Sequence, residues 1–233
     1  MENNARWCDL VCRSHGISTL WQEGFWVARQ PSPQFYPAGI TLQEDVAPEQ
    51  LIEELPVGMC AVKDSFADLD LASHGFEQLF EARWIYRAPT LGTAAPTGWT
   101  TVSTEKECDQ WLAACGLADV LPAALLRAES VRFLQRKCTH DVSAGAVLNL
   151  SGSVPGLTNV FSADVPLDDV WGDVAALCGE HFPSCPVVGY QRVQDLEAAI
   201  KAGFDDLAAL RVWVSRRIRY GPRARTRCAA HVV

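Results

Sequence analysis

The chain has 233 residues, of which 48% are hydrophobic and 21% are charged, and its formal net charge is −8. This composition is typical of a folded protein with a core of ordinary size, arranged as one large domain or two small ones. The acidic balance argues against broad binding to nucleic acid or to anionic membrane, because both need a basic surface.

No apolar run approaches the roughly 18 residues that a membrane-spanning helix requires. The N-terminal segment MENNARWCDLVCRSHG has no apolar stretch of signal-peptide length. We therefore expect a cytoplasmic protein. The nine cysteines are scattered and include no C-x-x-C pair, so most should be reduced core residues, among them Cys8 and Cys12, four apart on a helix.

The first half of the chain predicts a compact α/β order. Residues 24–42 indicate two strands joined by a turn rich in Gly, Pro and Ser. A short amphipathic helix at 48–55 and an apolar strand at 59–63 follow. Next come a helix ending in Gly-Phe at 68–76 and a strand at 82–87.

Residues 91–107 are rich in Pro, Gly and Thr and predict a linker. One or two helices follow within 111–134. The first half's order then returns as a hairpin at 145–161, a longer helix at 166–182 and a strand at 186–190. A helix ending in Gly-Phe at 195–204 and a strand at 210–216 complete it.

The shared landmarks indicate an internal duplication. Gly39 and Gly156, each opening a Gly-[Ile/Leu]-Thr triplet, are 117 residues apart, Gly75 and Gly203 are 128 apart, and Trp84 and Trp213 are 129 apart. We expect an α/β (α+β) fold of two tandem units with mixed sheets, related by a pseudo-twofold axis. The predicted divisions are an N-terminal half at 1–90, the linker, a C-terminal domain at 108–218 and a flexible basic tail at 219–233.

The segments GAVLNLSG, GLTNVFS, PVVGYQ and AAIKAGF followed by LRVWV, together with the helix that begins near Pro166, resemble the core of the GNAT superfamily of N-acyltransferases. The resemblance covers roughly the last third of the chain, and the N-terminal half looks like the partner half of tandem GNAT-like bacterial proteins. It implies two parallel strands that splay apart and hold acetyl-CoA or another acyl-CoA in the gap between them.

Carried onto this chain, the resemblance implies that the acyl carbonyl lies near 159–161 and that the pyrophosphate meets the turn at 162–165. The implied cofactor-binding residues are Val160, Phe161, Ser162, Ala163, Asp164, Val165 and Gly189. The turn departs from the family's [Arg/Gln]-x-x-Gly-x-[Gly/Ala] pattern, because SADVPLDD contains no glycine and no basic residue. Its acids suit a helix N-terminus, yet they repel phosphate.

Three residues are candidates for the chemistry. Tyr190 is a candidate acid for the leaving thiolate, or a buried tyrosine hydrogen-bonded to a neighbour. Asn159 could bind an acyl or acceptor oxygen, or satisfy a strand edge. Asp64, with Asp68 beside it, could act as a base or hold an amine at a strand end, or Asp64 and Ser65 could cap the next helix.

Two groupings of cysteine and histidine leave alternatives open. Cys178, His181 and Cys185 could ligate a metal, but a zinc site usually needs four ligands and Cys178 lies on an apolar helix face. We therefore predict no metal. Cys138 and His140 could form a nucleophile pair or simply be structural. The arginine-rich tail from Arg216 is either a solvated end or a contact for phosphate.

The resemblance implies an acyl-CoA-dependent N-acyltransferase, most simply an acetyltransferase, acting on a small amine or amino-acid-like acceptor. The unusual turn keeps open a non-catalytic GNAT-like binding protein. We expect a monomer or homodimer that binds neither nucleic acid nor membrane.

Overall fold

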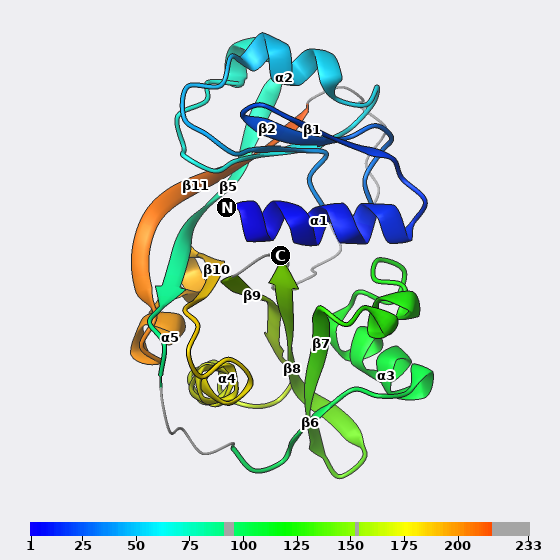
Figure 1. Cartoon of the computed structure of the whole chain (residues 1–233), viewed down its shortest axis with the longest axis vertical. Helices are drawn as coiled ribbons and strands as arrows, with labels where there is room; N and C mark the ends of the chain where they lie inside the picture. Colours follow the sequence, from blue (N-terminus) through cyan, green and yellow to red (C-terminus); the bar gives the residue numbers. More distant parts are fainter. Residues whose placement is uncertain (91–95, 152–153, 216–233) are drawn as a thin grey trace. The chain divides into compact units, whose positions relative to one another are not determined.

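The computed structural model describes residues 1–90, 96–151 and 154–215. Within them the chain divides into two compact units (Figure 1). The first comprises Met1–Arg83 together with residues 208–215, and the second comprises Trp84–Leu207. Two strands, β5 (Phe76–Arg87) and β11 (Asp205–Ser215), therefore contribute residues to both units.

The first unit is built on a mixed sheet with the strand order β1-β2-β3-β4-β11. Strands β3 and β4 are parallel, whereas the other neighbours are antiparallel. Its other elements in chain order are α1 (Glu2–Ser14), β1 (Thr19–Gln22), β2 (Phe25–Ala28), β3 (Gly39–Thr41), α2 (Pro48–Glu54), β4 (Ala61–Asp64) and the 3-10 turn η1 (Ala72–His74). The hairpin predicted at 24–42 and the helix predicted at 48–55 are thus confirmed.

Asp9 connects α1 to β1 and β2 through side-chain hydrogen bonds. Its Oδ1 accepts hydrogen bonds from Thr19 Oγ1 at 2.5 Å, Trp26 Nε1 at 2.9 Å and Trp21 Nε1 at 3.3 Å. Trp26 is fully buried, so its indole N–H needs a partner within the protein. This carboxylate supplies that partner and fixes how α1 meets the strands.

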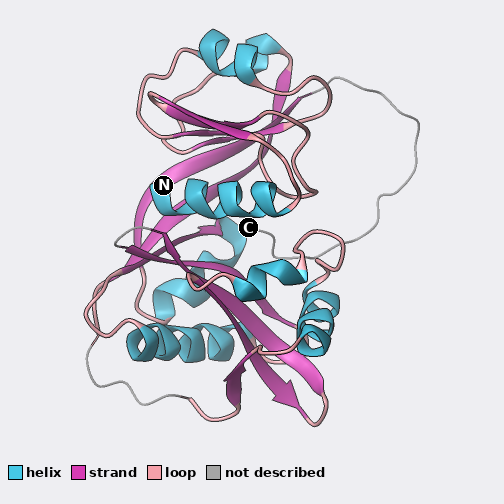
Figure 2. Ribbon diagram, turned by 45° about the vertical axis from the view of Figure 1, so that its right-hand side comes forward, coloured by secondary structure: helices cyan, strands magenta, loops and turns pink. Residues whose placement is uncertain are grey.

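The second unit contains the long strands of the predicted C-terminal domain (Figure 2). Its strand order is β6-β7-β8-β9-β10, followed by the end of β5. Strands β9 and β10 are parallel, whereas the pairs β6–β7, β7–β8 and β8–β9 are antiparallel. Its other elements are β6 (Trp99–Thr101), α3 (Glu105–Cys115), the 3-10 turn η2 (Ala123–Arg127), β7 (Val131–Cys138), β8 (Asp141–Ser151), β9 (Val154–Ser162), α4 (Leu167–His181), β10 (Val187–Arg192), the 3-10 turn η3 (Val193–Asp195) and α5 (Leu196–Lys201).

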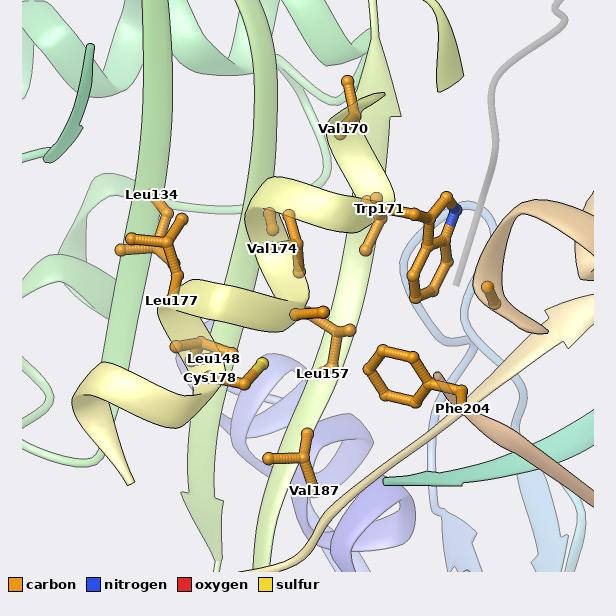
Figure 3. Packing of buried hydrophobic residues seen from close by; sticks show 14 of the residues in the cluster. Leu134, Leu148, Leu157, Val170, Trp171, Val174, Leu177, Cys178, Val187 and Phe204 are labelled. Atoms are coloured by element: carbon orange, nitrogen blue, oxygen red, sulfur yellow. The ribbon is translucent and has the colours of Figure 1, made fainter. Parts of the chain in front are cut away.

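Helices cover both faces of this second sheet. On one face, Trp111 of α3 packs edge-on against Phe133 and Phe161, with ring centroids 5.0 and 5.1 Å apart. On the other, the apolar face of α4 packs against β7, β8 and β9 (Figure 3). The residues drawn there on α4 include Val170, Trp171, Val174, Leu177 and Cys178, the helical spacing from which the sequence predicted this helix.

Glu107 organises the start of α3. Thr104 Oγ1, at the N-cap, accepts the Glu107 N–H at 3.2 Å, and the Glu107 carboxylate reaches back to accept the N–H of Ser103, the residue before the N-cap, at 3.0 Å. Lys137 Nζ donates to the same carboxylate at 2.9 Å. The bond from Lys137 and those from Ser103 lower the pKa of Glu107 to about 2.

The two units share a local pattern. In each, the Gly of a Gly-[Ile/Leu]-Thr triplet lies opposite a valine of the next parallel strand, Gly39 opposite Val62 and Gly156 opposite Val188. Each unit also takes in a strand from the other half of the chain, since β11 pairs with β4 and β5 neighbours β10. The shared pattern supports the duplication, and the duplication with its pseudo-twofold axis stays a prediction.

Several details of the sequence prediction need correction. The helix expected at 68–76 is only the 3-10 turn η1, and strand β1 was not predicted. The expected linker at 91–107 contains β6 and the start of α3. The sequence placed β5 wholly in the first half and β11 wholly in the second, whereas both are divided between the units. Residues 91–95 and the basic tail from Arg216 lie outside the described residues.

Candidate functional site

A β-bulge interrupts β9 at Asn159. Gly145 of β8 pairs with Phe161 and Val147 pairs with Thr158, so Ala146 alone faces two residues, Asn159 and Val160. Asn159 has a φ of 52°, in the left-handed region. Asparagine adopts this conformation more readily than most residues, and bulges commonly re-aim a strand near functional sites.

Strands β9 and β10 begin as a parallel pair and then stop pairing. The one pair in register is Gly156 with Val188, although β9 continues to Ser162 and β10 to Arg192, all of them described residues. Gly189 lies against β9 at this point, because a Cβ added there would be 2.8 Å from the carbonyl oxygen of Leu157. The expected divergence of these strands is therefore present, with a glycine at its start.

The structure brings six of the predicted site residues onto these two neighbouring strands. Residues 159–162 lie at the end of β9, and Gly189 and Tyr190 lie on β10. The side chains of Val160 and Phe161 pack into the core on opposite faces of the sheet. Any contact of these two residues with a ligand would therefore be made by their backbone.

Tyr190 packs edge-on against Trp84, with ring centroids 5.7 Å apart and planes at 79°. Trp84 lies on β5, a strand that the sequence assigned to the first half of the chain. Reasoning from the sequence used Trp84 only as a landmark of the duplication and did not place it beside Tyr190. The pairing of β5 with the second unit was the missing information.

The turn after β9 is closed by its own hydrogen bonds. Ser162 Oγ donates to the Val165 carbonyl oxygen and accepts the Val165 N–H at 3.1 Å. The Ala163 N–H donates to the Ser143 carbonyl oxygen at 2.8 Å. The backbone N–H groups of Ala163 and Val165 are therefore already hydrogen-bonded within the protein and are not available to a pyrophosphate.

Acidic side chains surround the same turn and the first turn of α4. Asp164, Asp168 and Asp169 are all exposed. Lys201 Nζ pairs with Asp168 at 3.0 Å and also with Glu197 at 3.0 Å, so this lysine is shared between two carboxylates. The helix capping residue is Pro166, which has no N–H to offer.

An acyl-CoA bound along β9 would meet the protein at two places, the bulge at Asn159 and the turn after β9. At the bulge, the buried Nδ2 of Asn159 has no hydrogen-bond partner among the described residues, so a ligand oxygen would satisfy it. At the turn, engaged N–H groups and three carboxylates do not fit a pyrophosphate. The acyl and pantetheine end fits this site, and the pyrophosphate end does not.

The predicted base Asp64 lies in the first unit, so the structure does not group it with Asn159 and Tyr190. Its carboxylate accepts the N–H groups of Leu69 at 3.1 Å, Asp68 at 3.3 Å and Phe66 at 3.4 Å. Burial raises its pKa. These bonds close the loop that follows β4 and do not cap a helix, because the next element is the 3-10 turn η1, which has Leu71 as its N-cap and no side-chain cap.

Lys63, next to Asp64, is another buried ionisable group of the first unit. It is 1% exposed, and its Nζ donates to Asn4 Oδ1 at 2.6 Å. Burial lowers the pKa of this lysine to about 8. The contact joins β4 to α1.

The cysteines with raised pKa are packed residues. Cys178 lies on the core face of α4, and burial raises the pKa of its thiol to about 12 (Figure 3). Burial likewise raises the pKa of Cys8 to about 11 and that of Cys12 to about 12. Across 1–90, 96–151 and 154–215, no three His, Cys, Asp or Glu side chains are grouped as metal ligands. Cys138, in contrast, is exposed at the end of β7.

An open groove of about 580 Å³ lies beside the exposed face of α4. Its lining residues are Pro96, Thr97, Arg136, Asp168, Asp169, Gly172 and Asp173. Asp173 is already engaged, because Trp99 Nε1 donates to it at 2.8 Å and Arg136 Nη1 lies 3.2 Å from the same oxygen. The groove adds to the acidic character of this side of the second unit.

Comparison with solved structures shows the fold. A GCN5-related N-acetyltransferase from Kribbella flavida superposes with a TM-score of 0.62 at 13% identity, covering 91% of this chain and 95% of that one. An acetyltransferase of the GNAT family from Colwellia psychrerythraea gives 0.51 at 12% identity, covering 86% and 85%. A conserved protein of unknown function from Staphylococcus epidermidis gives 0.52 at 8% identity, covering 83% and 84%.

The chain therefore has the GNAT fold, as its sequence resemblance implied. No family model matches the chain, and no curated protein matches it in sequence. No helix among the described residues is both long and apolar enough to cross a bilayer.

Proposed function

We propose that this protein is an N-acyltransferase that moves an acyl group from an acyl thioester, such as acetyl-CoA, to a small amine. The observation that carries the proposal is the bulge at Asn159, located where β9 stops pairing with β10 in a GNAT fold. Unpaired backbone on such strands can hydrogen-bond an extended arm such as pantetheine. The acidic surface near α4 suits a cationic acceptor.

Within this proposal, Tyr190 is the acid that protonates the leaving thiolate, and its edge-on packing against Trp84 fixes the ring. The resemblance implied that the residues of the turn bind the pyrophosphate, and in this proposal they do not. Ser162 closes the turn upon itself, and Asp164 with its acidic neighbours disfavours a tight grip on pyrophosphate.

The alternative is a non-catalytic GNAT-like protein that binds a different ligand on β9 and β10. The closed turn favours it, since the backbone groups that would hold the pyrophosphate are already paired. The two functions differ in whether a free thiol is released from an acyl thioester when an amine is present.

The experiment is an acyl-transfer assay of the full chain with acetyl-CoA, acetyl-pantetheine and a panel of small amines, monitoring thiol release and acylated product. We expect transfer to at least one amine, and Tyr190→Phe to lower kcat about 100-fold if the hydroxyl donates the proton. Tyr86→Phe makes the same chemical change on β5 and should leave kcat unaltered. Binding of a thioester without transfer to any amine would support the non-catalytic alternative.

A further inference from the structure

The loop between α2 and β4 exposes two large apolar side chains of the first unit. Val57 is 99% exposed and Met59 is 68% exposed, and they are the two most exposed large hydrophobic residues among those described. Exposed apolar residues that lie singly are common, whereas a pair on one short loop indicates a surface that another segment or molecule covers. A segment of this chain begins in the right place to do so.

The described part of the chain reaches this loop at Ser215, the last residue of β11. The Ser215 N–H donates to the Cys60 carbonyl oxygen at 2.9 Å, and the Cys60 N–H donates to Ser215 Oγ at 3.1 Å. Ser215 Oγ donates in turn to the Gly58 carbonyl oxygen at 3.3 Å. Residues 216–233, which lie outside the described residues, therefore begin beside the exposed loop.

The register of β11 indicates which of these residues meets the loop. The strand is antiparallel to β4, with Val214 opposite Ala61. Continued in the same direction, this register brings Ile218 alongside Val57 and Met59. All of these positions are on one face of the sheet, because alternate residues of a strand share a face. The first apolar residue after β11 therefore arrives where the loop exposes its own apolar residues.

The charges favour the same placement. Residues 216–233 include six arginines and no acidic residue, whereas the net charge of the whole chain is −8. Helix α2, which leads into the loop, carries Glu49 and Glu53 on its exposed side. The arginines that flank Ile218 are attracted to such carboxylates, so charge and apolar contact favour one position.

We propose that Ile218 packs on Val57 and Met59, so that the segment 216–220 of the same molecule covers the apolar loop at 56–59. The hydrogen bonds of Ser215 select this occupant, because they already hold the start of the segment at the loop. The covered surface belongs to the first unit and uses none of the residues on β9 and β10. The proposal is therefore independent of the proposed function.

Oxidation of methionine by hydrogen peroxide tests this proposal in the full chain. The protein has two methionines, Met1 at 42% exposed and Met59 at 68% exposed, so without a cover Met59 should react the faster. We expect the opposite order in the wild type, measured by mass spectrometry of the peptides. Ile218→Ser should raise the rate at Met59 about tenfold, because one isoleucine side chain is no longer buried on it. Val232→Ser makes a comparable change farther along the same segment and should leave that rate unaltered.

Val57→Ser removes the apolar contact from the side of the loop and should also speed the oxidation of Met59. Faster oxidation of Met59 than of Met1 in the wild type, with no change in Ile218→Ser, would overturn the proposal. Protection of Met59 that disappears on dilution would also overturn it, because the cover would then be a second copy of the chain. Protection that is independent of protein concentration and is lost in Ile218→Ser would support it.

Discussion

A substitution at Gly189 tests directly how closely β9 and β10 approach each other. A Cβ at this position would lie 2.8 Å from the Leu157 carbonyl oxygen and 3.6 Å from Ile85 Cγ1. The first distance is far shorter than an ordinary contact, and a strand carbonyl cannot rotate away as a side chain can. Gly189→Ala should therefore push the strands apart by several tenths of an ångström, at a cost of about 1–3 kcal/mol.

Gly172 provides the matched control. It lies on the exposed face of α4, and an added Cβ there meets nothing within 4 Å. Alanine is the better helix former, so Gly172→Ala should raise the free energy of unfolding by up to about 1 kcal/mol. The same chemical change thus has opposite signs at the two sites.

Thermal unfolding followed by circular dichroism measures both variants. For a chain of this size about 1 kcal/mol corresponds to roughly 2–4 °C in Tm, so Gly189→Ala should lower Tm by about 2–12 °C and Gly172→Ala should raise it slightly. An unchanged Tm in Gly189→Ala would refute the close approach of the two strands. A lowered Tm in Gly172→Ala would show that the exposed face of α4 is packed against something.

Three further predictions concern the stability and reactivity of individual side chains. Asp9→Ala should lower the free energy of unfolding by about 3 kcal/mol in urea titrations, because it leaves the buried indole N–H of Trp26 unpaired. Asp9→Asn should lower it less. If both variants were as stable as the wild type, the anchoring role of Asp9 would be contradicted. Glu107, with its folded pKa at about 2 and an ordinary value of 4.5, contributes stability above pH 4.5 that is lost as the pH falls toward 2. Glu107→Gln or Lys137→Met should flatten that part of the stability curve, and an unaltered curve would show that the pair contributes nothing. Maleimide should modify Cys138 in the native protein but Cys178 only after unfolding, and mass spectrometry of the labelled peptides would show which thiol has reacted. Rapid labelling of Cys178 in the native protein would contradict its burial.

Elements with strong local signals could be predicted from the sequence. Helix α4 repeats its apolar residues at helical spacing, and the hairpins at 24–42 and 145–161 have turn residues between two apolar runs. Such signals depend only on neighbours along the chain, which is why these elements match their predicted positions to within a few residues.

The failed helix at 68–76 shows a local competition that periodicity does not reveal. Asp64 takes up the backbone N–H groups of Phe66, Asp68 and Leu69, and Asp70 takes that of Ala72. Side-chain oxygens that bind backbone N–H groups in this way stabilise loop conformations over a helix. Only the short 3-10 turn η1 remains.

The candidate site depended on contacts that are distant in the sequence. Asn159 was predicted as a site residue, yet its bulge follows from a register shift against β8 that no residue type announces. Trp84 contacts Tyr190 only because β5 neighbours β10 and none of the strands β1 to β4 that precede it in the chain. Strand partners are chosen by the whole sheet, so a single sequence could not supply either contact.

The most direct test of the central claim is a calorimetric titration of the full chain with acetyl-CoA and, separately, with acetyl-pantetheine. The account holds that the acyl and pantetheine end binds at β9 and that the closed, acidic turn does not bind the pyrophosphate. Both ligands should therefore bind one to one, with affinities within about tenfold of each other. Absence of binding by either ligand at millimolar concentration would contradict the account of an acyl-thioester site. Binding of acetyl-CoA alone, far more tightly than acetyl-pantetheine, would contradict the account of the turn.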